Sequence, residues 1–295
     1  MTSMTRALMD ALRARLGASD PNPPRIALPP IVAPPARVYV PRRADAPTSQ
    51  HTTALLGIGH VGTRYATDVV LQFQAELAVA HEAVDTELPD DWARDHGFLP
   101  LATRVADHRE FLLRPDLGRR LAPDSLQRLR DTATRGADVQ IILADGLSAV
   151  ACMQSGPELY AALAAACTRR GLTVGTAVCA KFARVWLEDE IGAEVGATIA
   201  IIVLGERPGL GTGDGLSAYL VHAPALGKTD GDRNMMSNIH ARGTPPPEAA
   251  ERLAALAVAM IAQGTSGVSL DLAKVAGLVE RGYRAPQVRA RLVGR

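Results

Sequence analysis

The chain has 295 residues, of which 47% are hydrophobic, and this is enough for one large domain or two of ordinary size. Its 32 basic and 31 acidic side chains leave a net charge of +1, so no overall field favours nucleic acid or an anionic membrane as a partner. Because the sequence also lacks a membrane-spanning apolar run, a secretory signal and a C-x-x-C pair, we expect a cytoplasmic protein with buried free cysteines.

Residues 1–50 are expected to form a tail made of a short amphipathic helix and a proline-rich linker. The apolar residues of this helix recur four apart, at Met4, Leu8, Leu12 and Leu16. Nine prolines lie between residues 21 and 47, a composition typical of an extended linker. A helix this short is unstable alone, so it either docks on a partner surface or is an unstructured tail.

The segment HTTALLGIGHVGTRYATDVV holds the G-x-G-x-x-G spacing of a dinucleotide-binding turn, at Gly57, Gly59 and Gly62. Such a turn needs a buried strand before it, a helix after it, and then a second strand with an acidic residue. Only the helix is well supported, by apolar residues at helical spacing over 69–84 and by Thr67 as a candidate N-cap. Glycines that open a helix are therefore favoured, and a nucleotide-binding oxidoreductase that uses GIGHVG is the alternative.

Residues 51–135 are predicted to form a small N-terminal helical domain. The helix after Thr67 is followed by PDDWARDHG and then by PDSLQRLRD, in which Pro123 and Asp124 suit the start of another helix. No buried strand can be recognised in ELPDDWARDHG.

Residues 136–270 alternate buried strands with helices. DVQIILADGLSA, LTVGTAVCA and ATIAIIVLGERPGLG each contain an apolar run of strand length, and PELYAALAAACTRRG is typical of a helix that ends at Gly171. Strands that are apolar on both faces and alternate with helices imply a mainly parallel sheet covered on both sides. We therefore predict an α/β fold with a Rossmann-like, doubly wound domain whose ligand loops follow the strand ends, and a C-terminal extension over residues 271–295.

Two further motifs resemble cofactor sites but lack an essential part. Gly213, Gly215 and Ala218 match G-x-G-x-x-A, but LSAYLVHAP after them has strand composition, so a phosphate gains no helix N-terminus there. SNIHARG has the spacing of the D-x-H-x-x-G motif of cobalt-ligating histidines, with Asn238 in place of the Asp. His240 is therefore expected to be a structural or interface residue, and we predict neither a metal site nor a catalytic residue.

Six segments carry a resemblance to a known family: GHVGTRYAT, LRPDLGRRL, DVQIILADGLS, RVWLEDEIG, VLGERPGLGTGDGLSAY and DRNMMSNIHARGTPPPEAA. In this order they resemble the small subunit of ethanolamine ammonia-lyase, an adenosylcobalamin-dependent bacterial enzyme that converts 2-aminoethanol to acetaldehyde and ammonia. The resemblance implies a helical N-terminal part and a Rossmann-like C-terminal domain. It also implies a partner, the TIM-barrel large subunit, which carries the substrate and most of the radical chemistry.

The resemblance implies three cofactor-binding residues, namely Val185 in RVWLED, Glu206 in GERPGLG, and Met235 in DRNMMSN. Met235 stands where the family commonly has Cys, so a contact through the backbone would survive this change and a contact through the thiol would not. The implied reaction begins with homolysis of the cobalt–carbon bond, after which the adenosyl radical abstracts hydrogen from the substrate. The small subunit is expected to position the cofactor.

The resemblance also bears on the tail. Family members with such a tail resemble cargo proteins of bacterial microcompartments, so we expect residues 1–50 to be dispensable for catalysis and to direct packing at a shell. The remaining alternative is a noncatalytic scaffold that docks through this tail.

Overall fold

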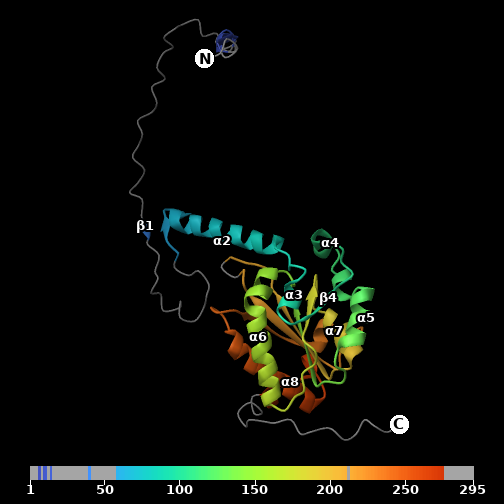
Figure 1. The fold of residues 1–295 in the computed structure, drawn as a ribbon. Coiled ribbons are helices and arrows are strands. Elements are labelled where there is room, and N and C mark those ends of the chain that lie inside the picture. The colour runs from blue at the N-terminus through green and yellow to red at the C-terminus, as the bar shows by residue number, and fades with distance from the viewer. Residues whose placement is uncertain are drawn as a thin grey trace, which may run out of the picture.

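The computed structural model describes residues 6–7, 9–11, 14, 39–40, 58–210 and 213–275. Its centre is a six-stranded sheet in the order β4-β6-β5-β7-β8-β9 (Figure 1). These strands are β4 (Leu99–Ala102), β5 (Val139–Ala144), β6 (Val178–Lys181), β7 (Ile199–Gly205), β8 (Leu216–His222) and β9 (Arg233–Ile239). The first four strands in that order are parallel, and β8 and β9 run antiparallel to their neighbours. The predicted α/β class with a mainly parallel sheet is confirmed.

Strands β5 and β7 form the centre of the sheet because their side chains are apolar on both faces. Every residue of both strands is buried, and the two strands pair along the whole length of β5. Gln140 is the one polar side chain in β5, and its amide donates hydrogen bonds to the carbonyls of Ile141 and Thr176 at 2.9 and 2.8 Å. Strands of this composition fit only a sheet that is covered on both sides.

Helices cover both faces of this sheet. They are α5 (Pro123–Thr132), α6 (Ala149–Arg169), α7 (Leu187–Val195) and α8 (Pro246–Gln263). Helices α6 and α8 share one core with Ile141, while α5 and α7 share the core on the opposite face with Ile142 (Figure 1). Successive strand residues point to opposite faces, so each strand supplies both cores. The predicted cover on two sides is confirmed, and the antiparallel β8 and β9 are the departure from an all-parallel Rossmann-like order.

Helix α6 begins earlier than predicted. We expected it to start near Pro157, but it starts at Ala149, where the hydroxyl of Ser148 accepts a hydrogen bond from Ala151 N at 3.1 Å. Ala151 and Cys152 in its first turn are fully buried in the core. This packing outweighs the usual helix-breaking effect of a proline, and Pro157 lies inside the helix.

The region predicted to be helical also contributes an edge strand to the central sheet. Residues 99–102 form β4, which pairs in parallel with β6, and α5 packs beside β4. A search for buried apolar runs misses β4 because it has only four residues, LPLA, and contains a proline. The other helices of the region are α2 (Thr67–Asp85), α3 (Trp92–Asp95) and α4 (His108–Leu113). A separate helical domain over residues 51–135 stays a prediction.

Helix α2 lies along the upper side of the α/β body in Figure 1 and extends beyond it. Thr67 is its first residue, and the predicted N-cap is wrong because Ala66 occupies that position. The helix buries only Val69, Ala80 and Ala83, whereas four of its other apolar side chains, Val70, Leu71, Leu77 and Val79, are exposed. Uncovered apolar surface on one element is typical of a contact with another molecule.

The N-terminal tail is described only in part. Residues 6–7, 9–11 and 14 are helical, in agreement with the predicted short helix, but the four positions of its apolar stripe lie outside the described residues. Strand β1 (Tyr39–Val40) pairs with β2 (His60–Val61), which forms a hairpin with β3 (Arg64–Tyr65). The rest of the proline-rich linker and residues 276–295 also lie outside the described part. Within the described residues, no helix has the length and apolar character to span a membrane.

The carboxyl ends of β5 and β7 approach each other closely at two glycines. Gly146 has a φ of +57°, and Leu147 N donates a hydrogen bond to Gly205 O at 2.9 Å. A Cβ added to Gly205 would lie 2.7 Å from Asp145 O and nearer still to Ser148 O, and both are backbone atoms. A side chain has no room at this position, so the close approach depends on glycine.

Gly205→Ala should lower the free energy of unfolding by about 1–3 kcal/mol, because the two strand ends have to move apart. Denaturant unfolding of the full chain measures this loss. Gly231→Ala is the matched control, since the nearest heavy atom to its added Cβ would be 3.6 Å away. Equal losses in the two variants would contradict the importance of the close approach.

Candidate functional site

A cavity at the carboxyl edge of the parallel strands, here called the strand-end cavity, is the candidate ligand site. From β5 the chain passes through α6 to β6 on one side of β5, and from β6 it passes through α7 to β7 on the other side. Open α/β sheets usually bind ligands in the crevice at such a change of direction. The cavity measures about 340 Å³ and is lined by residues 146–147, 183–185 and 204–207, by Ser217 and by Tyr219.

The buried carboxylate of Asp145 shapes one wall of this cavity. Asp145 follows β5 directly, and its two oxygens accept hydrogen bonds from the backbone N–H groups of Phe182 at 2.7 Å and Ala183 at 3.1 Å. These bonds hold the turn after β6, in which Phe182 has a φ of +56° that non-glycine residues rarely adopt. Burial raises the pKa of Asp145 to about 6, although the hydrogen bonds oppose the rise.

Glu206, at the end of β7, forms the polar wall. The hydroxyl of Ser217 and the backbone N–H of Asn238 both donate to Glu206 Oε1, the latter at 3.4 Å. The backbone N–H of Glu206 donates to Gly215 O at 2.9 Å. This bond joins the two ends of the segment between β7 and β8, residues 206–215, here called the glycine-rich loop. Burial, together with the charge of Glu206, raises the pKa of the Tyr219 hydroxyl. The wall therefore presents a carboxylate beside two hydroxyls.

Two arginines add positive charge to the cavity. The guanidinium of Arg184 lies over the Phe111 ring, 4.0 Å from its centroid, and Nη2 donates to Phe111 O at 2.6 Å. Burial lowers the pKa of Arg184, but a guanidinium stays protonated in proteins. Arg207 is exposed. A cavity with these groups and Glu206 suits a polar ligand that both donates and accepts hydrogen bonds.

The three residues assigned from the resemblance lie near one another. Val185 and Glu206 line the strand-end cavity. Met235 does not line it, but Met235 is the cross-strand partner of Tyr219, which does. The structure thus brings Val185 and Glu206 to one cavity and places Met235 on β9, beside the strand that carries Tyr219. The sequence did not indicate Asp145, although an Asp directly after a buried strand was the available signal.

The other sequence motifs have structural roles in the described part of the chain. Gly59 and Gly62 lie beside and within the hairpin of β2 and β3, so this part of the G-x-G-x-x-G does not follow a buried parallel strand, and Gly57 lies outside the described residues. The buried His240 bonds through Nε2 to Asn238 Oδ1 at 2.6 Å, in agreement with the predicted structural role. The three cysteines are free and buried. No cluster of metal-ligating side chains occurs among the described residues.

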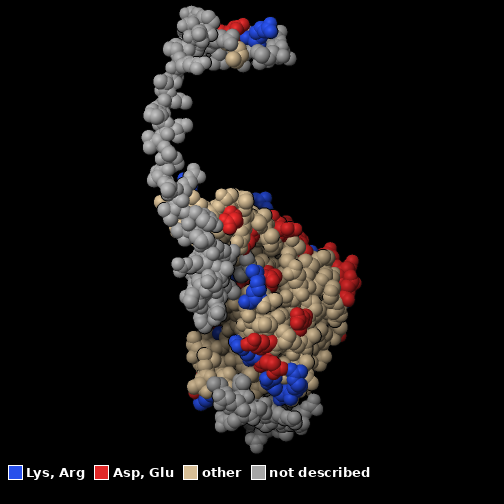
Figure 2. Space-filling view, turned by 90° about the vertical axis from the view of Figure 1, so that its left-hand side faces the viewer, with Lys and Arg blue, Asp and Glu red and all other residues tan. Residues whose placement is uncertain are grey.

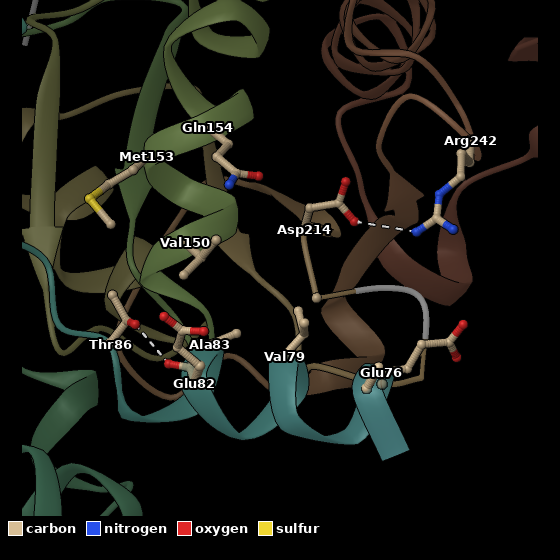
Figure 3. A pocket seen from close by; sticks show the side chains of 13 residues that line it. Glu76, Val79, Glu82, Ala83, Thr86, Val150, Met153, Gln154, Asp214 and Arg242 are labelled. Carbon is tan, nitrogen blue, oxygen red and sulfur yellow. Dashed lines mark hydrogen bonds and ion pairs between the residues drawn. The ribbon is translucent and has the colours of Figure 1, made fainter. Parts of the chain in front are cut away.

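A larger cavity of about 750 Å³, the α2–α6 groove, lies next to the same loop (Figure 3). Figure 3 shows Val79 and Glu82 of α2 on one side, Met153 of α6 on another, and the pair of Asp214 and Arg242 beyond them. None of the three residues assigned from the resemblance lines this groove. The glycine-rich loop borders both cavities, since residues 209, 213 and 214 line the groove and residues 206–207 line the strand-end cavity.

A mostly parallel sheet with a cavity at its strand ends, lined in part by a carboxylate, two hydroxyls and two arginines, is the arrangement in which open α/β proteins usually bind ligands. On the face shown in Figure 2, basic side chains are interspersed with acidic ones and form no large patch of the kind that a nucleic-acid surface needs. Residues 44–271 match the family model described as ethanolamine ammonia-lyase light chain (EutC). The chain belongs to this family, which supplies a subunit of a cobalamin-dependent lyase, and a light chain implies a larger partner subunit.

Asp145→Asn should flatten the pH dependence of stability between about pH 4 and pH 6. The pKa of Asp145 in the fold, about 6, lies above the ordinary value of 3.8, so the folded protein binds this proton more tightly than the unfolded chain. Stability due to this group is therefore greatest at low pH and falls, by about 3 kcal/mol in all, as the pH rises through that window. Asparagine does not titrate in this range. The variant should nevertheless be less stable than the wild type at every pH, because one backbone N–H loses its acceptor. Denaturant unfolding across this pH range measures both curves, and parallel curves would contradict the assignment.

Proposed function

We propose that the chain is the small subunit of an adenosylcobalamin-dependent ethanolamine ammonia-lyase, and that its strand-end cavity holds one edge of the cofactor against the large subunit. The observation that carries this proposal is the convergence of Val185 and Glu206, which are far apart in sequence, on one cavity. Family membership and the position of the cavity at the usual ligand edge of the sheet support it.

The cavity suits an edge of the cofactor rather than the whole molecule. Its volume of about 340 Å³ is at the lower end of the roughly 300–1,000 Å³ of sites for drug-sized ligands, and a corrinoid is larger than such ligands. The rim of cobalamin carries amide groups that donate and accept hydrogen bonds, and Glu206, Ser217 and Tyr219 offer matching groups. The rest of the cofactor has to be covered by another chain.

In this proposal the chain binds and orients the cofactor. When bound, adenosylcobalamin supplies the radical that abstracts hydrogen from the substrate. Glu206 accepts a hydrogen bond from the edge of the cofactor, and Val185 excludes water beside it. His240 supplies no cobalt ligand, because its Nε2 bonds to Asn238 and its Nδ1 accepts from Arg242 N at 3.2 Å. We assign no catalytic acid or base to this subunit.

The large subunit, expected to be a TIM barrel, is proposed to cover the carboxyl edge of the sheet. A cofactor held at this edge by two chains requires the partner to approach the same edge. The N-terminal end of α6 follows β5 at this edge, and α2 lines the groove beside that end of α6. Exposed apolar side chains of α2, such as Leu71 and Leu77, are therefore available to the partner. Docking of the tail at a microcompartment shell within the cytoplasm remains a further proposal.

Glu206→Gln should weaken cobalamin binding by roughly tenfold to a hundredfold, because a hydrogen bond to a charged acceptor is worth about 1.5–3 kcal/mol. The test coexpresses this chain with the large subunit, titrates the assembled complex with adenosylcobalamin by absorbance, and assays ammonia release from ethanolamine. The chain alone should release none. Glu248→Gln, an exposed carboxylate on α8, is the control. A wild-type complex that neither binds cobalamin nor releases ammonia would overturn the proposed function.

Leu71→Asp combined with Leu77→Asp should weaken association with the large subunit by at least tenfold, because two charges would be buried in an apolar contact. Both side chains are exposed, so the fold of the chain should tolerate them. Val268→Asp is the matched control, since Val268 is exposed and lies away from the cavity. Nearby Ser266 bonds to His222, at the end of β8 that is opposite to the strand-end cavity. Copurification of the two subunits measures association, and undiminished recovery of the double variant would remove α2 from the interface.

A further inference from the structure

A buried ion cluster joins the first turn of α7 to the first residue of β9. Arg233 donates from Nη1 and Nη2 to the two carboxylate oxygens of Asp189, at 3.1 and 2.6 Å, and from Nη1 to Glu188 Oε1 at 3.2 Å. The exposed fractions of these side chains are 2% for Arg233, 0% for Glu188 and 3% for Asp189. The fork of two parallel hydrogen bonds fixes both the distance and the orientation of the two elements.

Burial acts against ionisation of both carboxyl groups in this cluster. It raises the pKa of Glu188 far above its usual value and the pKa of Asp189 to about 6, while the charge of Arg233 opposes both changes. Arg233 contacts both carboxylate oxygens of Asp189 but only one oxygen of Glu188. The forked pair of Arg233 and Asp189 is therefore the centre of the cluster.

A buried ion pair of this kind is not required for stability alone. Removing an ion pair from water is costly, and apolar side chains of similar volume often give an equally stable or more stable protein. Glu188 Oε2 and Arg233 Nε also have no hydrogen-bond partner within the described residues. What the ion pair supplies and apolar packing lacks is a defined angle and register between α7 and β9.

The two elements that the pair joins carry two of the three residues assigned to the cofactor. Val185 lies three residues before Glu188, in the turn that leads into α7. Met235 lies two residues after Arg233 on β9, so both point to the same face of the sheet. Trp186 lies between the two elements, with its ring 5.5 Å from the guanidinium of Arg233 and its Nε1 donating to Asp230 at 2.7 Å.

We propose that Arg233, forked onto Asp189 beside Glu188, is a positioning residue that sets the separation between the Val185 wall of the strand-end cavity and Met235 on β9. This proposal rests on the proposed function, because it treats the cavity as the place that receives an edge of cobalamin. Arg233 touches no ligand itself. It acts through Asp189 and the adjoining Trp186.

Arg233→Lys tests the proposal because it keeps the charge and removes the fork. Each variant is made in the full chain with Trp92→Phe, so that Trp186 is the one remaining tryptophan. Arg130→Lys is the matched control. Arg130 of α5 forms a similar fork onto Glu194, which lies near the C-terminal end of α7, but this pair is on the surface. Trp186 emission is recorded in the chain alone, and adenosylcobalamin affinity is measured by absorbance in the assembled complex.

We expect Arg233→Lys to shift Trp186 emission and to weaken cobalamin binding about tenfold, the size of a typical loss of coupling between neighbouring residues, while Arg130→Lys changes neither. A wild-type affinity for Arg233→Lys, in a complex where Glu206→Gln binds more weakly, would overturn the positioning role and leave the proposed function standing. If the wild-type complex binds no cobalamin, the proposed function fails. In that case Trp186 emission alone decides the positioning role of Arg233. Unchanged emission in Arg233→Lys overturns the positioning of the Val185 wall, and shifted emission supports it.

A second variant separates positioning from simple stabilisation. Glu188→Met, Asp189→Leu and Arg233→Met together replace the cluster with apolar side chains that should fill the same space. We expect the thermal midpoint of the chain to stay near that of the wild type while cobalamin affinity remains reduced about tenfold. If the triple variant had both the thermal midpoint and the cobalamin affinity of the wild type, the cluster would only fill the core, and the proposal would be wrong.

Discussion

The carboxylate of Asp145 is the constraint on which the candidate site depends. It follows the central strand β5 and accepts two backbone N–H groups from the turn after β6, so the cavity wall that contains Val185 is fixed to the centre of the sheet. The close approach at Gly146 and Gly205 fixes the opposite wall, because no side chain separates the ends of β5 and β7. Both constraints involve backbone atoms, which cannot adapt as side chains do. The cavity is therefore rigid at its base.

The central architecture could be predicted from the sequence because its signals are local. Every residue of β5 and β7 is buried and, apart from Gln140, none has a polar side chain; such runs have few interpretations in a chain that also contains helices between them. A strand at β8 was indicated by the strand composition directly after the glycine-rich loop, but its antiparallel direction was not. By contrast, β4 depends on pairing with β6 at the edge of the sheet, and its short LPLA segment carries no such signal. The start of α6 was missed because Pro157 is a strong local stop signal, which packing against the sheet overrides.

The place of the site at the strand ends was predictable from the order of strands and helices, but its individual residues were predictable only as far as the resemblance reached. The resemblance selected Val185 and Glu206, which the fold brings to one cavity, and Met235, whose relation to that cavity passes through its cross-strand partner Tyr219. The residues that hold these positions were not predictable, because their partners are distant in sequence. Arg233 and Asp189 are 44 residues apart, and β7 and β8 lie between them in the chain. A pairing of this kind has no periodicity or spacing to reveal it.

The small size of the cavity has a consequence for how the proposed enzyme assembles. If an edge of the cofactor lies on this chain and the remainder on the large subunit, neither chain alone offers the full set of contacts. Each subunit then raises the affinity of the other for the cofactor, and by linkage the cofactor strengthens subunit association by the same factor. The glycine-rich loop lies where this coupling can act within one chain, because it borders both the cavity with Glu206 and the groove beside α2. A partner that covers this groove would contact residues 209, 213 and 214 of the same loop that presents Glu206 to the cofactor.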